Sequence, residues 1–137
     1  MNPLNLLDTS SLLLSKSLDL YSTNQRVIAS NIANAETPGY SPTRFEFEDE
    51  LRNAVTKSNP VLATTQVGHI PHAVSSIEQV KGAMTSDPDN TGIGDENGVS
   101  VDEEMIALSE NQIRYETAAQ LLKKKFSLLK YVVQDGQ

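Results

Sequence analysis

The sequence contains no cysteine and no tryptophan, and only 5% of its residues are aromatic. The absence of cysteine excludes disulfides, thiolate metal sites and cysteine nucleophiles. It also leaves the redox compartment open, so the cytosol, the periplasm and the outside of the cell are all compatible with this chain. Because aromatic side chains are scarce, we expect the buried apolar surface to come mainly from Leu, Ile, Val and Ala.

Basic residues are also scarce. The chain has 11 Lys and Arg against 18 Asp and Glu, and its formal net charge is −7. Most of the imbalance lies in residues 36–100, which carry ten acids and four bases. Since no segment is strongly basic, a nucleic-acid partner is disfavoured.

Long hydrophobic runs are missing too. The longest leucine run, Leu12–Leu14, is too short to span a bilayer. No Lys or Arg precedes Lys16, and no small-residue cleavage site follows, so we predict no cleaved secretory signal. Export, if it occurs, needs another route. The length of 137 residues fits a single domain, 1–137.

The clearest pattern predicts a C-terminal helix over residues 100–134. Ser100 and Glu103 fit a capping box at its start, and Glu110 and Arg114 have the spacing of an i,i+4 ion pair. Its apolar seam alternates steps of three and four residues, as in a heptad repeat. The seam consists of Val101, Met105, Leu108, Gln112, Tyr115, Ala119, Leu122, Phe126, Leu129 and Val133.

A second helix is predicted over residues 8–36, with Asp8, Thr9 or Ser10 as its cap. Its seam consists of Leu7, Ser11, Leu14, Leu18, Tyr21, Gln25, Ile28, Ile32 and Ala35. Helices with such narrow seams are not stable alone in water. We therefore expect the two to cover each other as a coiled coil, antiparallel or parallel, and further packing onto other copies of the chain would produce an assembly.

Residues 37–99 form a Pro- and Gly-rich middle that we expect to consist of a turn, extended segments and loops. Phe45–Glu48 and Val61–Val67 are candidates for short strands, and Asp87–Gly98 has the composition of a loop. The predicted fold class is therefore mainly α: a coiled-coil hairpin of long terminal helices around an irregular middle with room for short β strands.

No catalytic, cofactor-binding or metal site is predicted. His69 and His72 have no third ligand nearby, and Pro71 keeps them off one helical face. Asp87–Gly98 begins like an EF-hand loop but has Gly98 where a bidentate Glu is required. The carboxylates of Glu46, Glu48, Asp49 and Glu50 have no apolar walls around them in sequence, so a solvated acidic face is expected.

The decapeptide NIANAETPGY, residues 31–40, ends the first helix abruptly. Pro38 cannot continue a helix and biases Thr37 towards an extended conformation. The tetrapeptide Thr37–Tyr40 fits a type II turn, with Gly39 supplying the positive φ angle.

NIANAETPGY after an amphipathic helix resembles the signature of the flagellar axial proteins, which form the rod, the hook and the hook-associated parts. The C-terminal VSVDEEMIALSENQIRYETAAQLLKKKFSLLKYVV resembles the short proximal rod members of that family. The resemblance covers residues 10–50 and 97–133, and Glu36 stands where Asp or Asn is more usual.

The resemblance implies a structural protein and no enzyme, cofactor, small-molecule substrate or nucleic acid. It implies helical assembly into the periplasmic rod of the basal body, which transmits torque from the membrane ring to the hook, after type III export without a cleaved signal. The implied partners are copies of the chain, other rod proteins, the adaptor FliE, the export gate and the MS ring.

Two sets of residues would carry this role. The family motif turn comprises Asn31, Ile32, Ala33, Asn34, Ala35, Thr37, Pro38, Gly39 and Tyr40. The helix-packing and assembly seam comprises Leu14, Leu18, Tyr21, Ile28, Ile32, Met105, Leu108, Tyr115, Ala119, Leu122, Phe126 and Leu129. Two alternatives remain open at this point: a helical export chaperone or adaptor, and a small hydrolase using His69, His72 and the acidic cluster.

Overall fold

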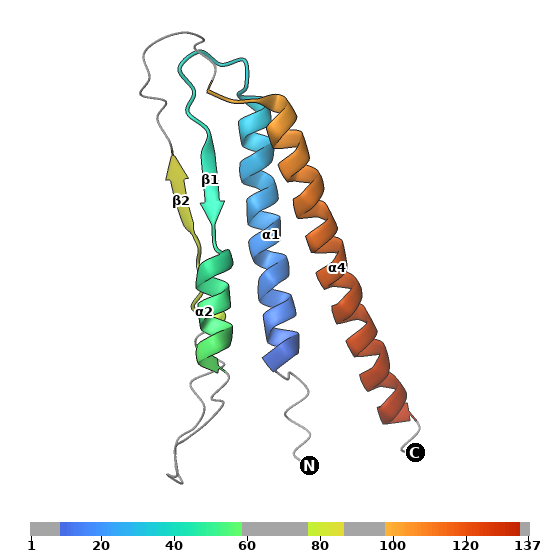
Figure 1. Ribbon diagram of the computed structural model, residues 1–137. Helices are drawn as coiled ribbons and strands as arrows, with labels where there is room; N and C mark the ends of the chain where they lie inside the picture. Colours follow the sequence, from blue (N-terminus) through green and yellow to red (C-terminus); the bar gives the residue numbers. More distant parts are fainter. Residues whose placement is uncertain (1–8, 59–76, 87–97, 135–137) are drawn as a thin grey trace.

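The computed structural model describes residues 9–58, 77–86 and 98–134. In chain order the elements are α1 (Thr9–Ala33), β1 (Thr43–Glu46), α2 (Glu48–Ser58), β2 (Ala83–Ser86) and α4 (Val101–Gln134). Helix α1 stands in the middle, with α4 antiparallel to it on one side and the strands and α2 on the other (Figure 1). The mainly α fold with packed terminal helices is confirmed. The candidate sites at His69, His72 and 87–97, the candidate strand Val61–Val67 and the cap Asp8 lie outside the described residues.

The two long helices begin and end for local reasons. At the start of α4, the amide of Glu103 donates to Ser100 Oγ at 3.4 Å, which is one half of the predicted capping box. Thr9 and Ser10, which we considered as caps, lie inside α1. Helix α1 ends at Ala33, before the predicted residue 36. In the part of the chain that the structure describes, no helix is both long and apolar enough to cross a membrane.

Strands β1 and β2 form an antiparallel pair in which Phe45 lies opposite Met84 and Glu46 opposite Ala83. The pairing joins residues about forty positions apart in the chain, which no local pattern specifies. Only β1 overlaps a strand predicted from the sequence, at Phe45 and Glu46.

We did not predict α2 from the sequence. Its first turn is Glu48, Asp49 and Glu50, which are three of the four carboxylates interpreted above as a solvated acidic face; the fourth, Glu46, ends β1. Acidic side chains at that place favour a helix because they oppose the positive end of the helix dipole. The three carboxylates are exposed as expected. They nevertheless begin a helix, which we did not predict because the surrounding sequence is rich in Pro and Gly.

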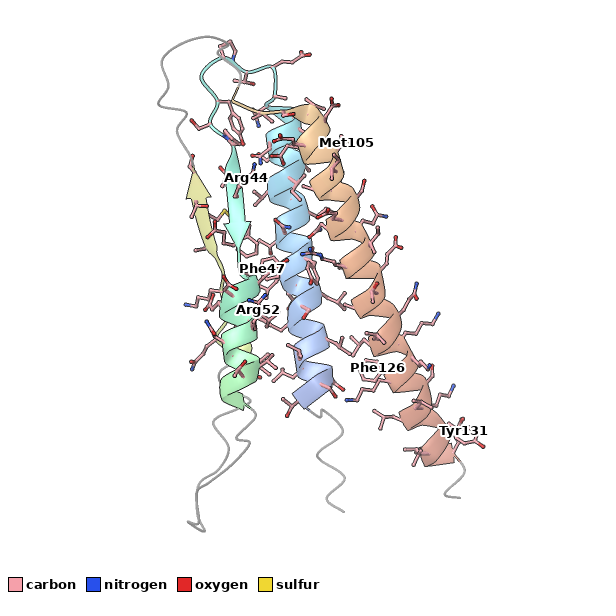
Figure 2. The ribbon with its side chains drawn as sticks, viewed as in Figure 1. Arg44, Phe47, Arg52, Met105, Phe126 and Tyr131 are labelled. Carbon is pink, nitrogen blue, oxygen red and sulfur yellow. The ribbon has the colours of Figure 1, made fainter. Side chains whose placement is uncertain are left out.

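The hydrophobic core lies between α1 and the layer of β1, β2 and α2. It is built from Leu20, Phe47, Ala54, Ile77 and Val80. Phe47 points toward α1 (Figure 2) and contacts Tyr21 edge-to-face, with ring centroids 5.4 Å apart, and it stacks on Phe45 at 5.2 Å. The main core is therefore on the side of α1 that does not contact α4.

Gly82 makes this core possible, and sequence reasoning missed it. Its φ angle is +68°, and a Cβ atom there would lie 2.5 Å from the ring of Phe45. Its amide donates to Glu50 Oε2 at 2.9 Å, which ties β2 to the first turn of α2. A glycine is needed for both the backbone angle and the close approach.

Candidate assembly surface

The motif at residues 31–40 forms a corner held by one buried amide. Asn31 is 1% exposed. Its Nδ2 donates to the carbonyl of Thr43 at 2.8 Å, and its Oδ1 accepts from the amide of Thr43 at 3.0 Å and from the hydroxyl of Tyr40 at 3.0 Å. The side chain thus satisfies both backbone groups of the first residue of β1, as a neighbouring strand would.

The turn that follows has the predicted geometry. The amide of Tyr40 donates to the carbonyl of Thr37 at 3.2 Å, and Gly39 has a φ angle of +73°, as a type II turn requires. Asn34 Nδ2 donates to the carbonyl of Ser30 at 2.8 Å, capping the end of α1. Among the remaining motif residues, Ala35 is buried, Ile32 is half-buried, and Ala33 and Pro38 are exposed.

The face that α4 turns towards α1 differs from the predicted seam. The buried residues of α4 are Glu104, Asn111 and Ala118. Each lies one position before a predicted seam residue, namely Met105, Gln112 and Ala119. Met105 and Phe126 are 49% and 48% exposed, and Tyr115 is also exposed, whereas Leu108, Ala119, Leu122 and Leu129 are half-buried. On α1, Ile28 is buried and Leu14, Leu18, Tyr21 and Ile32 are half-buried.

A polar contact explains why α4 presents this face, and not the predicted seam, to α1. Asn111 is 3% exposed; its Nδ2 donates to the carbonyl of Tyr21 at 3.0 Å, and its Oδ1 accepts from Asn24 Nδ2 at 2.9 Å. A buried amide must keep its hydrogen bonds, so this contact fixes which side of α4 meets α1. A heptad pattern is identified from the spacing of apolar residues, so it does not predict a contact made by a buried polar side chain.

Ionic contacts also differ from the expected ones. Arg114 pairs with Glu48 at the start of α2 and not with Glu110 on its own helix. The side chain of Lys125 contacts Ser10 Oγ at the start of α1. These contacts link α4 to the first turn of α2 and to the start of α1.

Towards the chain termini, α1 and α4 diverge (Figure 1), and an open groove of about 440 Å³ lies along them. Leu18, Ala119, Leu122 and Phe126 supply its apolar lining, and Lys123 and Lys130 lie at its edge. Four of these six residues belong to the predicted seam. Their apolar surface is only partly covered by the described part of the chain.

The exposed apolar surface is concentrated on α4. Of the twelve large hydrophobic side chains that are exposed among the described residues, Met84 alone lies elsewhere. The other eleven are Val101, Met105, Ile106, Ile113, Tyr115, Leu121, Phe126, Leu128, Tyr131, Val132 and Val133. We call these eleven residues the α4 surface; Met105 and Tyr131 near its two ends are labelled in Figure 2. Large apolar side chains that are exposed in this number on one helix indicate a site of protein association.

Comparison with known proteins shows which family this chain resembles. The family model for flagella basal body rod proteins matches residues 18–40, which span most of α1 and the motif corner. Similarity to individual proteins extends much further. The chain is 30% identical over 126 residues to the flagellar basal body rod protein FlgB of Salmonella typhimurium, covering 88% of this chain and 90% of that protein.

Two more relatives carry the same description. FlgB of Bacillus subtilis is 30% identical over 113 residues, covering 82% of this chain and 84% of its own length. FlgB of Buchnera aphidicola is 29% identical over 122 residues, covering 86% and 89%. These relatives are rod proteins and not chaperones or hydrolases, so both alternatives from the sequence are abandoned. Identity at this level over nearly the whole of both chains shows that this chain belongs to the FlgB family of flagellar basal body rod proteins.

Proposed function

We propose that this chain, a structural and non-enzymatic component of the flagellar basal body rod, builds the rod by packing its α4 surface against other copies of itself. The observation that carries the proposal is the position of the exposed apolar residues. Eleven of the twelve lie on one helix, and they occur on both flanks of its contact with α1 and on its outer side. A helix that is apolar on several sides is stable only when it is covered on several sides.

The isolated chain covers only one of those sides, so assembly must supply the rest of the burial. Burial of apolar surface yields about 25 cal/mol per Å², and binding to the folded form stabilises it by mass action. We expect the purified chain to be partly helical, with a broad thermal transition of low midpoint, and to gain stability only in the assembled rod. A sharp transition at high temperature in dilute solution, measured by circular dichroism, would contradict this.

The finer details belong to the same proposal. We propose that residues 1–137 act as a single unit, that copies are arranged helically in the proximal rod, and that the rod transmits torque from the membrane ring to the hook. The proposed neighbours are other rod proteins, FliE, the export gate and the MS ring, reached by type III export without a cleaved signal. The FlgB relatives and the motif corner support this part.

The experiment places a charge on the α4 surface without touching the core. Ile113→Asp and Leu128→Asp alter exposed side chains, and Gln120→Asp is the matched control on an exposed polar position of the same helix. Each variant is expressed in cells that lack their own copy of the gene. We expect both apolar variants to be produced but to lose motility and to be missing from isolated basal bodies, while the control behaves as the wild type. Normal motility of both variants would contradict the proposal.

A further inference from the structure

Polar and small residues line the contact between α1 and α4 at intervals of seven positions on each helix. They are Ser10, Ser17 and Asn24 on α1 and Asn111, Ala118 and Lys125 on α4. Because the two helices are antiparallel (Figure 1), the first residue of one row stands level with the last residue of the other. We call these three facing pairs the polar ladder.

Contacts at both ends of the polar ladder establish its pairing. Asn24 Nδ2 donates to Asn111 Oδ1 at 2.9 Å, and the side chain of Lys125 contacts Ser10 Oγ. Both residues of the middle pair are buried, at 9% and 7% exposure. This contact therefore buries small and polar residues at the place where a coiled coil ordinarily buries large apolar ones.

The apolar residues of α4 do not determine how far along α1 this helix lies. They also recur at intervals of seven positions, so a shift by one heptad replaces each with another apolar residue. The set consists of Leu108, Tyr115, Leu122 and Leu129. On α1, Leu14, Tyr21 and Ile28 repeat in the same way. Apolar packing alone is therefore satisfied in several registers, which differ by about 10 Å along the helix axis.

The amides of Asn24 and Asn111 do distinguish these registers. Asn111 is 3% exposed, and its Nδ2 donates to the carbonyl of Tyr21 at 3.0 Å in addition to the contact with Asn24. A shift of α4 by one heptad in either direction separates Asn111 from both partners, and one of the two shifts places Ala118 beside Asn24. A buried amide that loses its hydrogen bonds changes an equilibrium by about tenfold or more.

The ion pair between Arg114 and Glu48 is a weaker determinant of the register. Its side chains are 49% and 52% exposed, and an ion pair that is open to water contributes little because solvent screens it. A buried amide at a coiled-coil contact, by contrast, fixes the register at some cost in stability.

We infer that Asn24 and Asn111 are the register-determining residues of this chain and hold α4 at one position along its own α1. The inference goes beyond the proposed function and does not depend on which molecule covers the α4 surface, because it concerns a contact within one chain. It gives the polar ladder a role in assembly all the same. The register fixes where the α4 surface stands relative to the motif corner, so a chain with several registers would present several different surfaces.

Disulfides introduced into the purified full-length chain test the inference, and the absence of cysteine removes any background. Ser17→Cys/Ala118→Cys reports the observed register. Ser17→Cys/Lys125→Cys and Ser10→Cys/Ala118→Cys report a shift by one heptad in the two directions. Positions displaced by about 10 Å cannot form a disulfide without such a shift. The intrachain disulfide of each pair is measured after oxidation in dilute solution.

Each cysteine pair is placed in the otherwise unchanged chain and in a chain with Asn24→Leu/Asn111→Leu. A matched control carries Arg26→Leu/Gln120→Leu, which adds leucines at exposed positions of the same two helices. In the unchanged and control chains we expect only the disulfide of the observed register. In the chain with Asn24→Leu/Asn111→Leu we expect the shifted disulfides to increase by about tenfold or more.

A second readout separates a role in register from a role in stability. Leucine at a coiled-coil contact adds apolar burial, so we expect the thermal midpoint of Asn24→Leu/Asn111→Leu, measured by circular dichroism, to stay the same or to rise. Amides that only stabilised the fold would give a lower midpoint and leave the register unchanged. Asn24→Ala/Asn111→Ala, which adds no bulk, repeats the test should leucine not fit.

Three results would overturn the inference. The first is a level of shifted disulfides in both amide variants that equals the level in the control. The second is the presence of shifted disulfides in the unchanged chain, which would show that the amides do not select one register. The third is the absence of the Ser17→Cys/Ala118→Cys disulfide from the folded chain, which would show that the polar ladder is not formed.

Discussion

The two sides of α1 differ in how completely the chain covers them. On the side of β1, β2 and α2, aromatic and aliphatic side chains close a core in which Ile77 is fully buried. On the side of α4, the buried contacts are small or polar, as at Asn111 and Ala118, and large apolar residues beside them stay exposed. One side is completed within the chain, and the other leaves apolar surface for a neighbour. The stability of the monomer and the ability to assemble are therefore located in different parts of the molecule.

The largest expected effect is the difference in monomer stability between the alanine substitutions of two phenylalanines. Phe47→Ala removes the centre of the core and should lower the free energy of unfolding by about 3–5 kcal/mol, enough to unfold a marginal chain. Phe126→Ala removes a half-exposed ring and should change monomer stability by less than about 1 kcal/mol while weakening incorporation into basal bodies. Urea unfolding followed by circular dichroism measures the difference. Equal destabilisation by the two changes would end the distinction between the two sides.

Two glycines with positive φ angles sharpen the comparison within the well-packed layer. Gly82→Ala adds a Cβ atom against the ring of Phe45 as well as backbone strain, and we expect a loss of about 3 kcal/mol. Gly39→Ala adds the strain alone, because nothing lies within 4 Å of its Cβ position, and should cost about 1 kcal/mol. The same urea titration compares them. If Gly39→Ala were the more harmful change, the close approach at Gly82 would not be needed.

The corner between α1 and β1 depends on one side chain. Asn31→Ala removes three hydrogen bonds and leaves both backbone groups of Thr43 without this partner, so we expect a loss of about 2 kcal/mol. Tyr40→Phe removes one of the three and should cost roughly a third as much. Hydrogen exchange at the Thr43 amide reports the contact directly. An unchanged exchange rate in Asn31→Ala would show that the amide does not hold β1.

Substitutions of Gly39, at the tip of the turn, are expected to cost less than Asn31→Ala. Gly39→Val places a β-branched residue at a positive φ angle and should cost about 1–2 kcal/mol, whereas Gly39→Asn should be nearly neutral, since Asn tolerates that conformation. The difference in unfolding midpoint between the two variants measures the strain. Motility of cells carrying Gly39→Val then tells whether the corner also matters for the rod, which stays a prediction from the family motif.

Local interactions explain what could be read from the amino-acid order. The helices over most of 9–33 and 101–134, the cap at Ser100 and the turn at Thr37–Tyr40 each depend on groups within four residues of one another. Helix α2 also has a local signal, the acidic first turn at Glu48–Glu50. It was missed because the surrounding prolines and glycines were given more weight.

The tertiary structure decided which partner each surface meets. Asn111 selects the side of α4 that contacts α1, and Arg114 pairs with Glu48 instead of Glu110, which is closer in the sequence. Gly82 has no side chain and so leaves room for the ring of Phe45. In each case the deciding atoms come from segments at least 37 residues apart in the chain. Heptad spacing therefore determined that α4 is helical and apolar, whereas burial and hydrogen bonding over long range determined which of its residues remain for another copy.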